Sequence, residues 1–425
     1  MAKKNIKAAK KVLAFKVFIF AAVLILYGVS AVFYRTQIDA ALNLAKYGTA
    51  DISEIRGEST SKTDFQAGKL KVHYVDVGQG DATVIELPCD KTMIIDGGSS
   101  LSKINRGKLT AYMNNNLEHI DGFDYVILTH SDEDHSGGLY EILKNFPVRE
   151  NGRIYRPNQK SSYSGYADPA LSKAGIETFW GNYGQNAAVQ NSAAYKNFLD
   201  AAYGQEADNV TVIVTDANKP DDMNILHDLN GNGKYDGGKS EEYLISFYAP
   251  AQAAWNKNNN YSPIISLEYQ DRTFMFSGDA ESVAEKAFVN ENGAAFGNAD
   301  VIKLGHHGSN TSTSVEYLKA ILPSATDNPN VIAVISSNPA GNSHGHPHKQ
   351  VLDRLEAFGF KAENVLRTDT VGTIVLAVSD GTLMYGTIEI SQGGGFEPLS
   401  WVTFGAAIVI VIFVLLFVVK FHKKR

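Results

Sequence analysis

The sequence has little cysteine: Cys89 is the single one among 425 residues, so no disulfide can form within the chain. Cys89 follows Pro88 at the end of an apolar stretch, and no histidine lies near it in the sequence. These surroundings predict a buried structural thiol and argue against a catalytic nucleophile.

Positive charge is also scarce outside the two ends of the chain. Ten of the 39 basic residues lie before residue 17 or after residue 419, which leaves 29 basic against 46 acidic residues and a net charge of −17 between them. Proteins that bind nucleic acid non-specifically usually carry a basic face. The charge balance therefore argues against tight binding of long DNA, although it is compatible with a local basic groove.

Long uncharged segments occur near both ends. Val17–Tyr34 has 18 residues and Trp401–Val419 has 19, and either is long enough to span a bilayer. Basic residues lie on the outer side of both segments. They predict cytoplasmic tails at 1–16 and 420–425, with the part between them outside the cytoplasm. The alternative for the first segment is a signal peptide that is cleaved near Ser30.

The chain between these segments divides into a domain and two linkers. Residues 35–68 and 392–400 are polar or rich in small residues, as linkers are. Residues 69–391 therefore form the predicted domain, anchored at the cell membrane. No internal repeat is visible, and the Tyr-rich stretch that starts at Val148–Lys160 is expected to be irregular.

The stretch YVILTHSDEDHSGGL, residues 125–139, carries the main functional signal. Tyr125–Thr129 is apolar and β-branched, as in a short buried strand, and a helix is expected to begin at Leu139. Between them, four ligand-type side chains occupy six positions: His130, Asp132, Asp134 and His135. Imidazoles and carboxylates converging from a short loop are donors that suit a divalent ion. The alternative is a polar loop that caps the helix, but four such residues favour the metal site.

Other predicted strands end in the same residue types. The stretches are TMIIDGG (92–98), RTFMFSGDA (272–280) and VIKLGHHGS (301–309). The residues at their ends are Asp96, Asp279, His306 and His307. Strands that deliver Asp or His at their carboxyl ends predict a metal site along one edge of sheets.

Taken together, the motifs resemble the metallo-β-lactamase superfamily and, within it, the hydrolase-like domain of the ComEC competence proteins. The matching stretches are VDVGQGDATVIEL (75–87), IIDGG (94–98), LTHSDEDHSGG (128–138), FSGDAE (276–281), KLGHHGSNTSTS (303–314), GHPH (345–348) and RTDTVGTI (367–374). The resemblance implies an α/β fold, namely an αββα sandwich of two mixed sheets with metals at one edge, here flanked by two transmembrane helices. It also implies that Asp96 orients the metal loop, and that Asp81 and Gln79 lie beside the metals as supporting or substrate-contacting residues.

The chain departs from the superfamily at two positions. The usual loop is H-x-H-x-D-H, and Asp132 stands at the second histidine; a later metal histidine is also missing, where Asn260 and its neighbours are found. Asn260 becomes a candidate supporting or substrate-contacting residue. The resemblance then implies an ordinary site made by Asp134, His135, His306 and a bridging Asp279. The other site would be oxygen-rich, with His130, Asp132 and Asp279. Such sites favour manganese or magnesium over zinc, so we expect one or two divalent ions, zinc or manganese.

A metal site of this kind lowers the pKa of a bound water and makes hydroxide available for attack on a carbonyl or phosphorus centre. Asp134 is a catalytic candidate through its place in this site. His346 or His307 could protonate the leaving group. The alternatives are a surface role for His346 and a supporting contact to His306 for His307.

The favoured function is a membrane-anchored, extracytoplasmic, metal-dependent hydrolase of phosphodiesters, with a nucleotide or a nucleic-acid end as substrate. Lys303 offers a cation near the same edge. Two alternatives stay open. The first is hydrolysis of carboxylic esters, lactones or lactams, and the second is a non-catalytic binding protein with a vestigial metal site.

A separate motif, DLNGNGKYD at residues 228–236, has the spacing of a calcium loop. The ligand-type positions are Asp228, Asn230, Asn232 and Asp236. The twelfth position is Lys239 and not glutamate, so Glu241 or Glu242 would have to complete the site in a longer loop. The alternative is a plain hairpin turn rich in asparagine and glycine.

Overall fold

The computed structural model describes residues 52, 54–101, 107–158, 193–205, 209–216, 223–238, 240–248, 255–292, 296–338 and 344–388. The predicted membrane segments Val17–Tyr34 and Trp401–Val419 lie outside these stretches. Within them, no helix combines the length and the hydropathy that crossing a membrane requires.

One sheet of the described residues has nine strands in the order β1-β16-β15-β2-β3-β4-β5-β6-β7. The strands are β1 (Arg56–Gly57), β2 (Leu70–Tyr74), β3 (Thr83–Leu87), β4 (Lys91–Ile95), β5 (Phe123–Ile127), β6 (Val148–Arg156), β7 (Thr211–Val214), β15 (Thr373–Ser379) and β16 (Thr382–Ile388). From β4 to β7 neighbouring strands are parallel, whereas the others pair antiparallel. Strands β2 and β3 pair antiparallel as a hairpin whose connection contains residues 78–81.

The second sheet has seven strands in the order β14-β13-β12-β11-β10-β9-β8, again among the described residues. The strands are β8 (Ile225–His227), β9 (Tyr243–Tyr248), β10 (Ile264–Tyr269), β11 (Arg272–Phe276), β12 (Val301–Lys303), β13 (Ile332–Ile335) and β14 (Val365–Arg367). Strands β11 to β14 run parallel, and β8 to β11 pair antiparallel. Both sheets are therefore mixed, as predicted.

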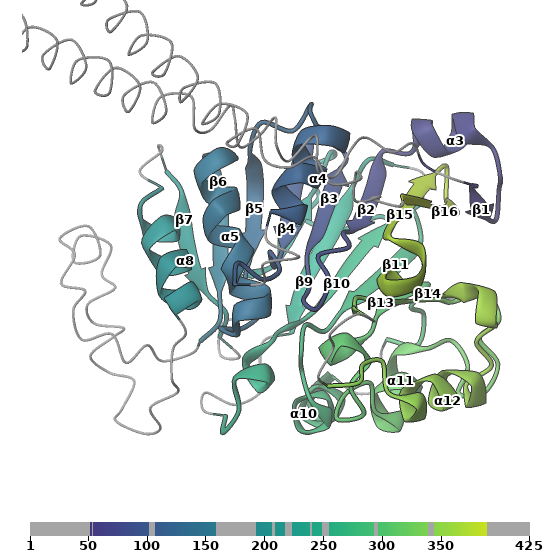
Figure 1. Cartoon of the computed structure of the whole chain (residues 1–425). Helices are drawn as coiled ribbons and strands as arrows, with labels where there is room; N and C mark the ends of the chain where they lie inside the picture. The colour runs from purple at the N-terminus through teal and green to yellow at the C-terminus, as the bar shows by residue number, and fades with distance from the viewer. Residues whose placement is uncertain are drawn as a thin grey trace, which may run out of the picture. The chain divides into compact units, whose positions relative to one another are not determined.

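Helices cover the outer face of each sheet (Figure 1). They are α3 (Lys62–Ala67), α4 (Lys108–Asn116), α5 (Glu133–Asn145), α8 (Ala193–Tyr203), α10 (Ser282–Asn292), α11 (Val315–Ile321), α12 (Lys349–Ala357) and α13 (Thr368–Val371), with short 3₁₀ turns η1 (Asn258–Tyr261), η2 (Gly305–Gly308) and η3 (Ala362–Asn364). Helices α4, α5 and α8 pack on the nine-stranded sheet, and α10, α11 and α12 pack on the seven-stranded sheet.

The residue pattern of β15 shows why the sheets form a layered core. Ile374, Leu376 and Val378 join the apolar cluster between the two sheets, whereas Val375 and Ala377 join the cluster under the helices. Successive side chains of a strand point to opposite faces, so a strand that is buried on both faces is apolar throughout. The two sheets thus face each other, with helices outside.

The prediction of irregular structure at Val148–Lys160 is wrong for its first part, which is strand β6. Its sequence VRENGRIYR has no clear alternation, and β6 owes its conformation to parallel pairing with β5 on one side and β7 on the other. Tertiary pairing therefore overrides the weak local signal.

Two further local predictions are corrected. Helix α5 begins at Glu133 and not at Leu139, so Gly137 and Gly138 lie inside the helix, although glycine disfavours helix interiors by about 1 kcal/mol. Cys89 is exposed and not buried, because it lies in the tight turn between β3 and β4 at a φ of 62°. Its thiol contacts Glu241 at 3.4 Å.

Candidate metal centre

The predicted ligands gather where parallel strands of both sheets end. Strand β4 is followed by Asp96, β5 by His130, β11 by Asp279 and β12 by His306 and His307. The first turn of α5 adds Asp134 and His135 beside them. In α/β sheets, the carboxyl ends of parallel strands are the usual place for a functional site.

Asp96 orients His135. Nδ1 of His135 donates to Oδ2 of Asp96 over 2.8 Å, and the same carboxylate accepts from the backbone N and the hydroxyl of Thr129, each at 2.8 Å. Nε2 of His135 then lies 3.2 Å from Oδ1 of Asp279. A carboxylate that holds one ring nitrogen and presents the other is the usual support of a metal-binding histidine.

His307 has a similar arrangement. Its Nδ1 lies 3.2 Å from Oδ1 of Asp81, and its Nε2 lies 3.2 Å from Oδ2 of Asp134 and 3.6 Å from Oδ2 of Asp279. The contact with Asp81 has the distance of an ion pair but not the alignment of a hydrogen bond. Its backbone has a φ of 55°, in the left-handed region that non-glycine residues rarely adopt outside strained functional sites.

His130 faces the same point from the other side. Its Nδ1 contacts the hydroxyls of Thr129 at 3.1 Å and Ser262 at 3.3 Å. Its Nε2 lies 3.7 Å from Oδ2 of Asp132 and 3.8 Å from Oδ2 of Asp279. Ser262 also accepts a hydrogen bond from the backbone N of Asp279 at 3.1 Å, so this serine supports two members of the cluster.

The side chains present fit a divalent cation. The Nε2 atoms of His130, His135 and His307 and Oδ1 of Asp279 are buried and have no hydrogen-bond partner among the described residues. One ligand atom each from Asp81, His135, Asp279 and His307 forms a group in which all atoms lie within 4.8 Å of one another. Buried polar atoms without partners are rare, and an ion is one explanation for them.

The electrostatics agree with this conclusion. Burial by itself would lower the pKa of His307, but Asp279 and Asp81 raise it to about 10. The pKa of His135 is also raised well above its usual range, because Asp279 and Asp96 outweigh its burial. Burial would raise the pKa of Asp134, yet His307 and His135 hold it at about 2. The carboxylates of the cluster are therefore ionised and favour positive charge beside them, which protonated imidazoles supply in the absence of a metal ion.

His306 takes a more peripheral place than His307. Its Nε2 lies 3.7 Å from Oδ2 of Asp279, and its Nδ1 contacts the Thr311 hydroxyl at 3.2 Å and the Asn259 amide at 3.3 Å. Burial lowers the pKa of His306, and Asp279 only partly opposes this effect. Both histidines thus reach Asp279, and of the two it is His307 that also faces Asp134.

The asparagine run that replaces the missing histidine contacts the centre from η1. Asn258 donates to Oδ1 of Asp132 at 2.6 Å. Asn260 is buried, and its side-chain oxygen accepts from the backbone N of Glu281 at 3.0 Å. Asn260 therefore supports the loop after Asp279. The roles of Asn258, Ser262 and Thr129 were not predicted, since an isolated Asn, Ser or Thr carries no ligand signal in a sequence.

Glycines allow close backbone contacts between the first turns of α5 and the loops that contain Gly80 and Gly97. A Cβ on Gly80 would lie 2.4 Å from the carbonyl oxygen of Asp134, and one on Gly138 would lie 1.9 Å from the carbonyl oxygen of Gly97. The backbone N of Asp81 donates to the same Asp134 carbonyl at 3.2 Å. Only glycine permits this approach, which explains why Gly138 is kept inside helix α5.

His346 and Gln79 lie at the rim. The His346 ring is 5.3 Å from that of His306 and 6.1 Å from that of His307, and its Nδ1 is 3.5 Å from Nε2 of Gln79. Burial, His307 and His306 lower the pKa of His346 to about 4. Lys303, in contrast, does not face an open edge: it is buried and paired with Asp81.

The calcium-type loop has a different environment. Asp228 accepts from the backbone N of Asn230 at 3.1 Å, Gly231 at 2.7 Å and Gly233 at 2.5 Å. Oδ2 of Asp236 accepts from the side chains of Asn230 at 2.6 Å and Asn232 at 2.9 Å. Of the two glutamates considered, Glu242 is buried against the loop and accepts from the backbone N of Leu229 and Asp236.

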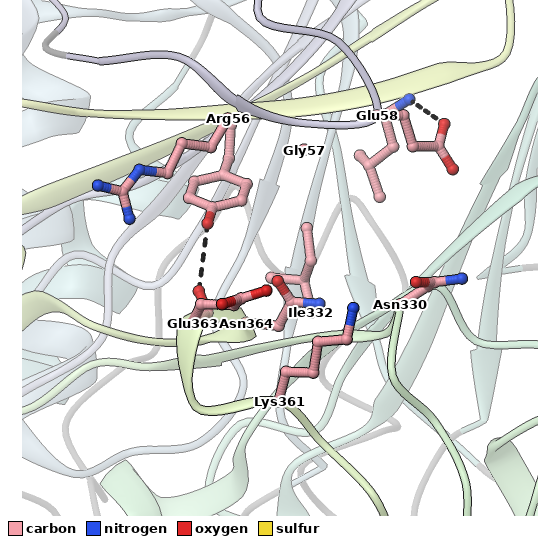
Figure 2. A pocket seen from close by; sticks show the side chains of 10 residues that line it. Arg56, Gly57, Glu58, Asn330, Ile332, Lys361, Glu363 and Asn364 are labelled. Carbon is pink, nitrogen blue, oxygen red and sulfur yellow. Dashed lines mark hydrogen bonds between the residues drawn. The ribbon is translucent and has the colours of Figure 1, made fainter.

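Two cavities contain none of the candidate metal ligands. One of about 410 Å³ is lined by Arg56, Glu58, Lys361 and Glu363 among others (Figure 2). The Tyr385 hydroxyl donates to the Glu363 carbonyl beside it. Another, of about 480 Å³, is lined in part by His73, Glu86 and His119.

Comparisons with known proteins agree with this fold and site. A sequence profile described as metallo-beta-lactamase superfamily matches residues 75–151. The chain is 26% identical over 318 residues to ComE operon protein 3 of Bacillus subtilis, covering 72% of this chain and 32% of that protein. It is 26% identical over 294 residues to recombination protein 2 of Haemophilus influenzae, covering 69% and 27%. Competence protein ComA of Neisseria gonorrhoeae is 32% identical over 139 residues, covering 32% and 18%.

Solved structures align with the chain only at low similarity. The metallo-beta-lactamase SMB-1 bound to 2-mercaptoethanesulfonate aligns with a TM-score of 0.31 and 11% identity, over 60% of this chain and 80% of that one. A diphosphatase from the PhnP family aligns with a TM-score of 0.31 and 11% identity, over 68% and 94%.

The chain is a metallo-β-lactamase-fold protein. Within that fold it is related in sequence to the competence proteins just described, and it spans about a third or less of their length.

Proposed function

We propose that this chain is a membrane-anchored, extracytoplasmic, metal-dependent hydrolase of phosphodiesters. The observation that carries the proposal is the convergence of His130, His135 and His307 on Asp279, with buried Nε2 atoms that have no hydrogen-bond partner among the described residues. A divalent ion held there would lower the pKa of a bound water and polarise the bond to be cleaved.

The half of the centre with His135 and His307 is supported by carboxylates. Each ring has a carboxylate behind it, Asp96 or Asp81, and each presents Nε2 towards Asp279. The half with His130 and Asp132 has fewer imidazole donors and more oxygen. Carboxylate-rich positions suit manganese or magnesium, and such ions bind phosphate oxygens well.

His346 is the proposed proton donor. At a pKa of about 4 its ring is neutral in the free protein, so it carries no extra proton near pH 7. An anionic phosphate bound beside it would raise this pKa and allow the ring to deliver a proton to the leaving oxygen. His307 is not suited to that task, because its two nitrogens face Asp81 on one side and Asp134 on the other.

The relatives support a nucleic-acid or nucleotide substrate. Their names refer to competence and recombination. The excess of acidic residues argues for short or single-stranded substrates and against tight binding of duplex DNA.

The test of the activity is a substrate panel. The manganese-loaded protein is assayed on bis-p-nitrophenyl phosphate, a short single-stranded oligonucleotide, nitrocefin and a lactone. Cleavage of the phosphodiesters is expected. Turnover of the lactone or nitrocefin alone would favour the ester or lactam alternative, and metal binding without any turnover would favour a binding protein.

The proposed membrane topology rests on the basic residues outside Val17–Tyr34 and Trp401–Val419. Protease added to intact cells should then digest residues 69–391. Protection of this region in intact cells, with digestion only after lysis, would place the domain on the cytoplasmic side.

A further inference from the structure

Lys303 is a buried ammonium group at the edge of the metal centre. It is the last residue of β12, and its side chain is 3% exposed. Its Nζ donates to Oδ2 of Asp81 at 2.8 Å and to the carbonyl oxygen of Leu304 at 3.1 Å. Lysine is almost never fully buried unless it is paired, so its partner is the clue to its role.

Asp81 connects this lysine to a candidate ligand. One carboxylate oxygen, Oδ2, contacts Lys303, and the other, Oδ1, lies 3.2 Å from Nδ1 of His307. The Asp81 backbone is held as well: its N donates to Asp134, and its carbonyl oxygen accepts from Gly98 at 2.8 Å. Burial would raise the pKa of Asp81, but Lys303 and His307 together hold it below its usual range.

We infer that Lys303 and Asp81 are a pair of positioning residues for His307, in which Lys303 keeps Asp81 away from the metal so that Nε2 of His307 can reach it. The inference rests on the proposed metal centre. It assigns Lys303 to the support of a ligand and not to a substrate phosphate. It also excludes Asp81 from the ligands, although its oxygens lie within reach of them.

The need for a charged partner follows from the number of carboxylates nearby. Asp134 and Asp279 already face Nε2 of His307 at 3.2 and 3.6 Å. A third carboxylate that is not neutralised would compete with the imidazole for any cation, because opposite charges attract strongly where water is excluded. A fixed ammonium group removes that competition and leaves Oδ1 of Asp81 as the ion-pair partner of Nδ1.

The experiment is a cobalt(II) titration of the full chain, followed by the visible absorption of the bound ion. The variants are Asp81→Asn, Lys303→Met and the double variant. Lys91→Met is the matched control, since Lys91 also donates to a buried aspartate, Asp124, at 2.8 Å, but at the opposite end of strand β4.

Asp81→Asn should weaken cobalt binding by about 10- to 100-fold, the usual range for a residue that supports a metal ligand. Lys303→Met should change the cobalt spectrum, because Asp81 becomes free to join the ligands. In the Asp81→Asn background, Lys303→Met should change neither spectrum nor affinity further, because Lys303 acts through Asp81. Lys91→Met should behave as the parent protein.

If Lys303→Met has the same cobalt spectrum as the parent protein, the inference is overturned. It is also overturned if the double variant has a different spectrum from Asp81→Asn alone. If Lys303→Met does not fold, Lys303→Gln carries the same expectation, since it keeps a donor for Asp81 without the charge. No substrate is involved, so absence of phosphodiester cleavage leaves the inference intact. Failure of the parent protein to bind cobalt would overturn the proposed function together with it.

Discussion

The metal centre and the loop at 228–236 use the same functional groups in opposite surroundings. In the metal centre, the carboxylate of Asp279 is buried and faces imidazole nitrogens at 3.2 to 3.8 Å. In the loop, Asp228 is half-buried, and backbone N–H groups of the same loop donate to its carboxylate. The comparison teaches that a buried carboxylate facing imidazoles favours a cation strongly, whereas a carboxylate that already accepts several backbone hydrogen bonds favours one less.

The largest expected effect is the loss of metal from the centre. Asp279→Asn should reduce bound metal strongly and abolish hydrolysis without unfolding the domain, because four histidines lose their shared carboxylate. The measurements are metal content by elemental analysis and turnover on a phosphodiester. Asp236→Asn in the loop at 228–236 is the control and should keep the parent turnover and the parent content of zinc or manganese. Full activity of Asp279→Asn would contradict the site.

The second prediction concerns pH. His307 has a raised pKa of about 10 in the metal-free chain, so below that pH it carries a proton that a cation must displace. Metal affinity should therefore rise between pH 7 and 9, by about tenfold per pH unit for each proton released. Cobalt titrations at several pH values measure the slope. An affinity independent of pH would show that no protonated histidine is displaced.

The same raised pKa affects stability in the absence of metal. A group whose pKa is raised by folding stabilises the folded state fully below its unfolded pKa, about 6.5 for histidine, and loses this effect as the pH passes its folded pKa. Chelator-treated protein should therefore become less stable from about pH 7 to 10. Urea unfolding at these pH values tests the trend, and His307→Gln should weaken it.

The next prediction compares a glycine beside the metal centre, Gly138, with a glycine of the loop at 228–236, Gly233. Gly138→Ala would place a Cβ 1.9 Å from the Gly97 carbonyl oxygen, so the first turn of α5 must shift. We expect a loss of about 1–3 kcal/mol of stability and weaker metal binding.

Gly233 in the loop is the comparison. A Cβ at this position would meet no atom within 4 Å, and the φ is 73°. Gly233→Ala should therefore cost about 1–2 kcal/mol of stability from backbone strain alone and leave metal binding unchanged. Equal metal affinity in both variants would contradict the argument.

The smallest expected effect is calcium binding by the loop, which we keep as a proposal. Calcium at ten times its dissociation constant would stabilise the chain by about 1.4 kcal/mol, a rise of a few degrees in Tm at most. Asp228→Ala should erase this rise, whereas Lys234→Ala should keep it, because its position contributes a backbone carbonyl to such loops. A parent protein whose Tm does not respond to calcium would show that the loop is a plain turn.

Much of the fold was predictable because it depends on local pattern. The strands around β4, β5, β11 and β12 are short apolar runs that end in a turn, and each carries its Asp or His just beyond the end. The sequence alone therefore predicted which residue types meet at one sheet edge. It could not predict β6, whose polar sequence forms a strand only between two neighbours.

The contacts that each residue of the metal centre makes depend on the tertiary structure. Asp81 and Lys303 are separated by 222 positions, and they meet because the two sheets face each other. His306 and His307 both lie in a left-handed turn and both reach Oδ2 of Asp279, but only the folded chain brings His307 to Asp81 and Asp134 as well. Sequence periodicity reports which face of a strand is buried, but not which atom of a buried side chain meets which partner, because that is set by packing between elements distant in the chain.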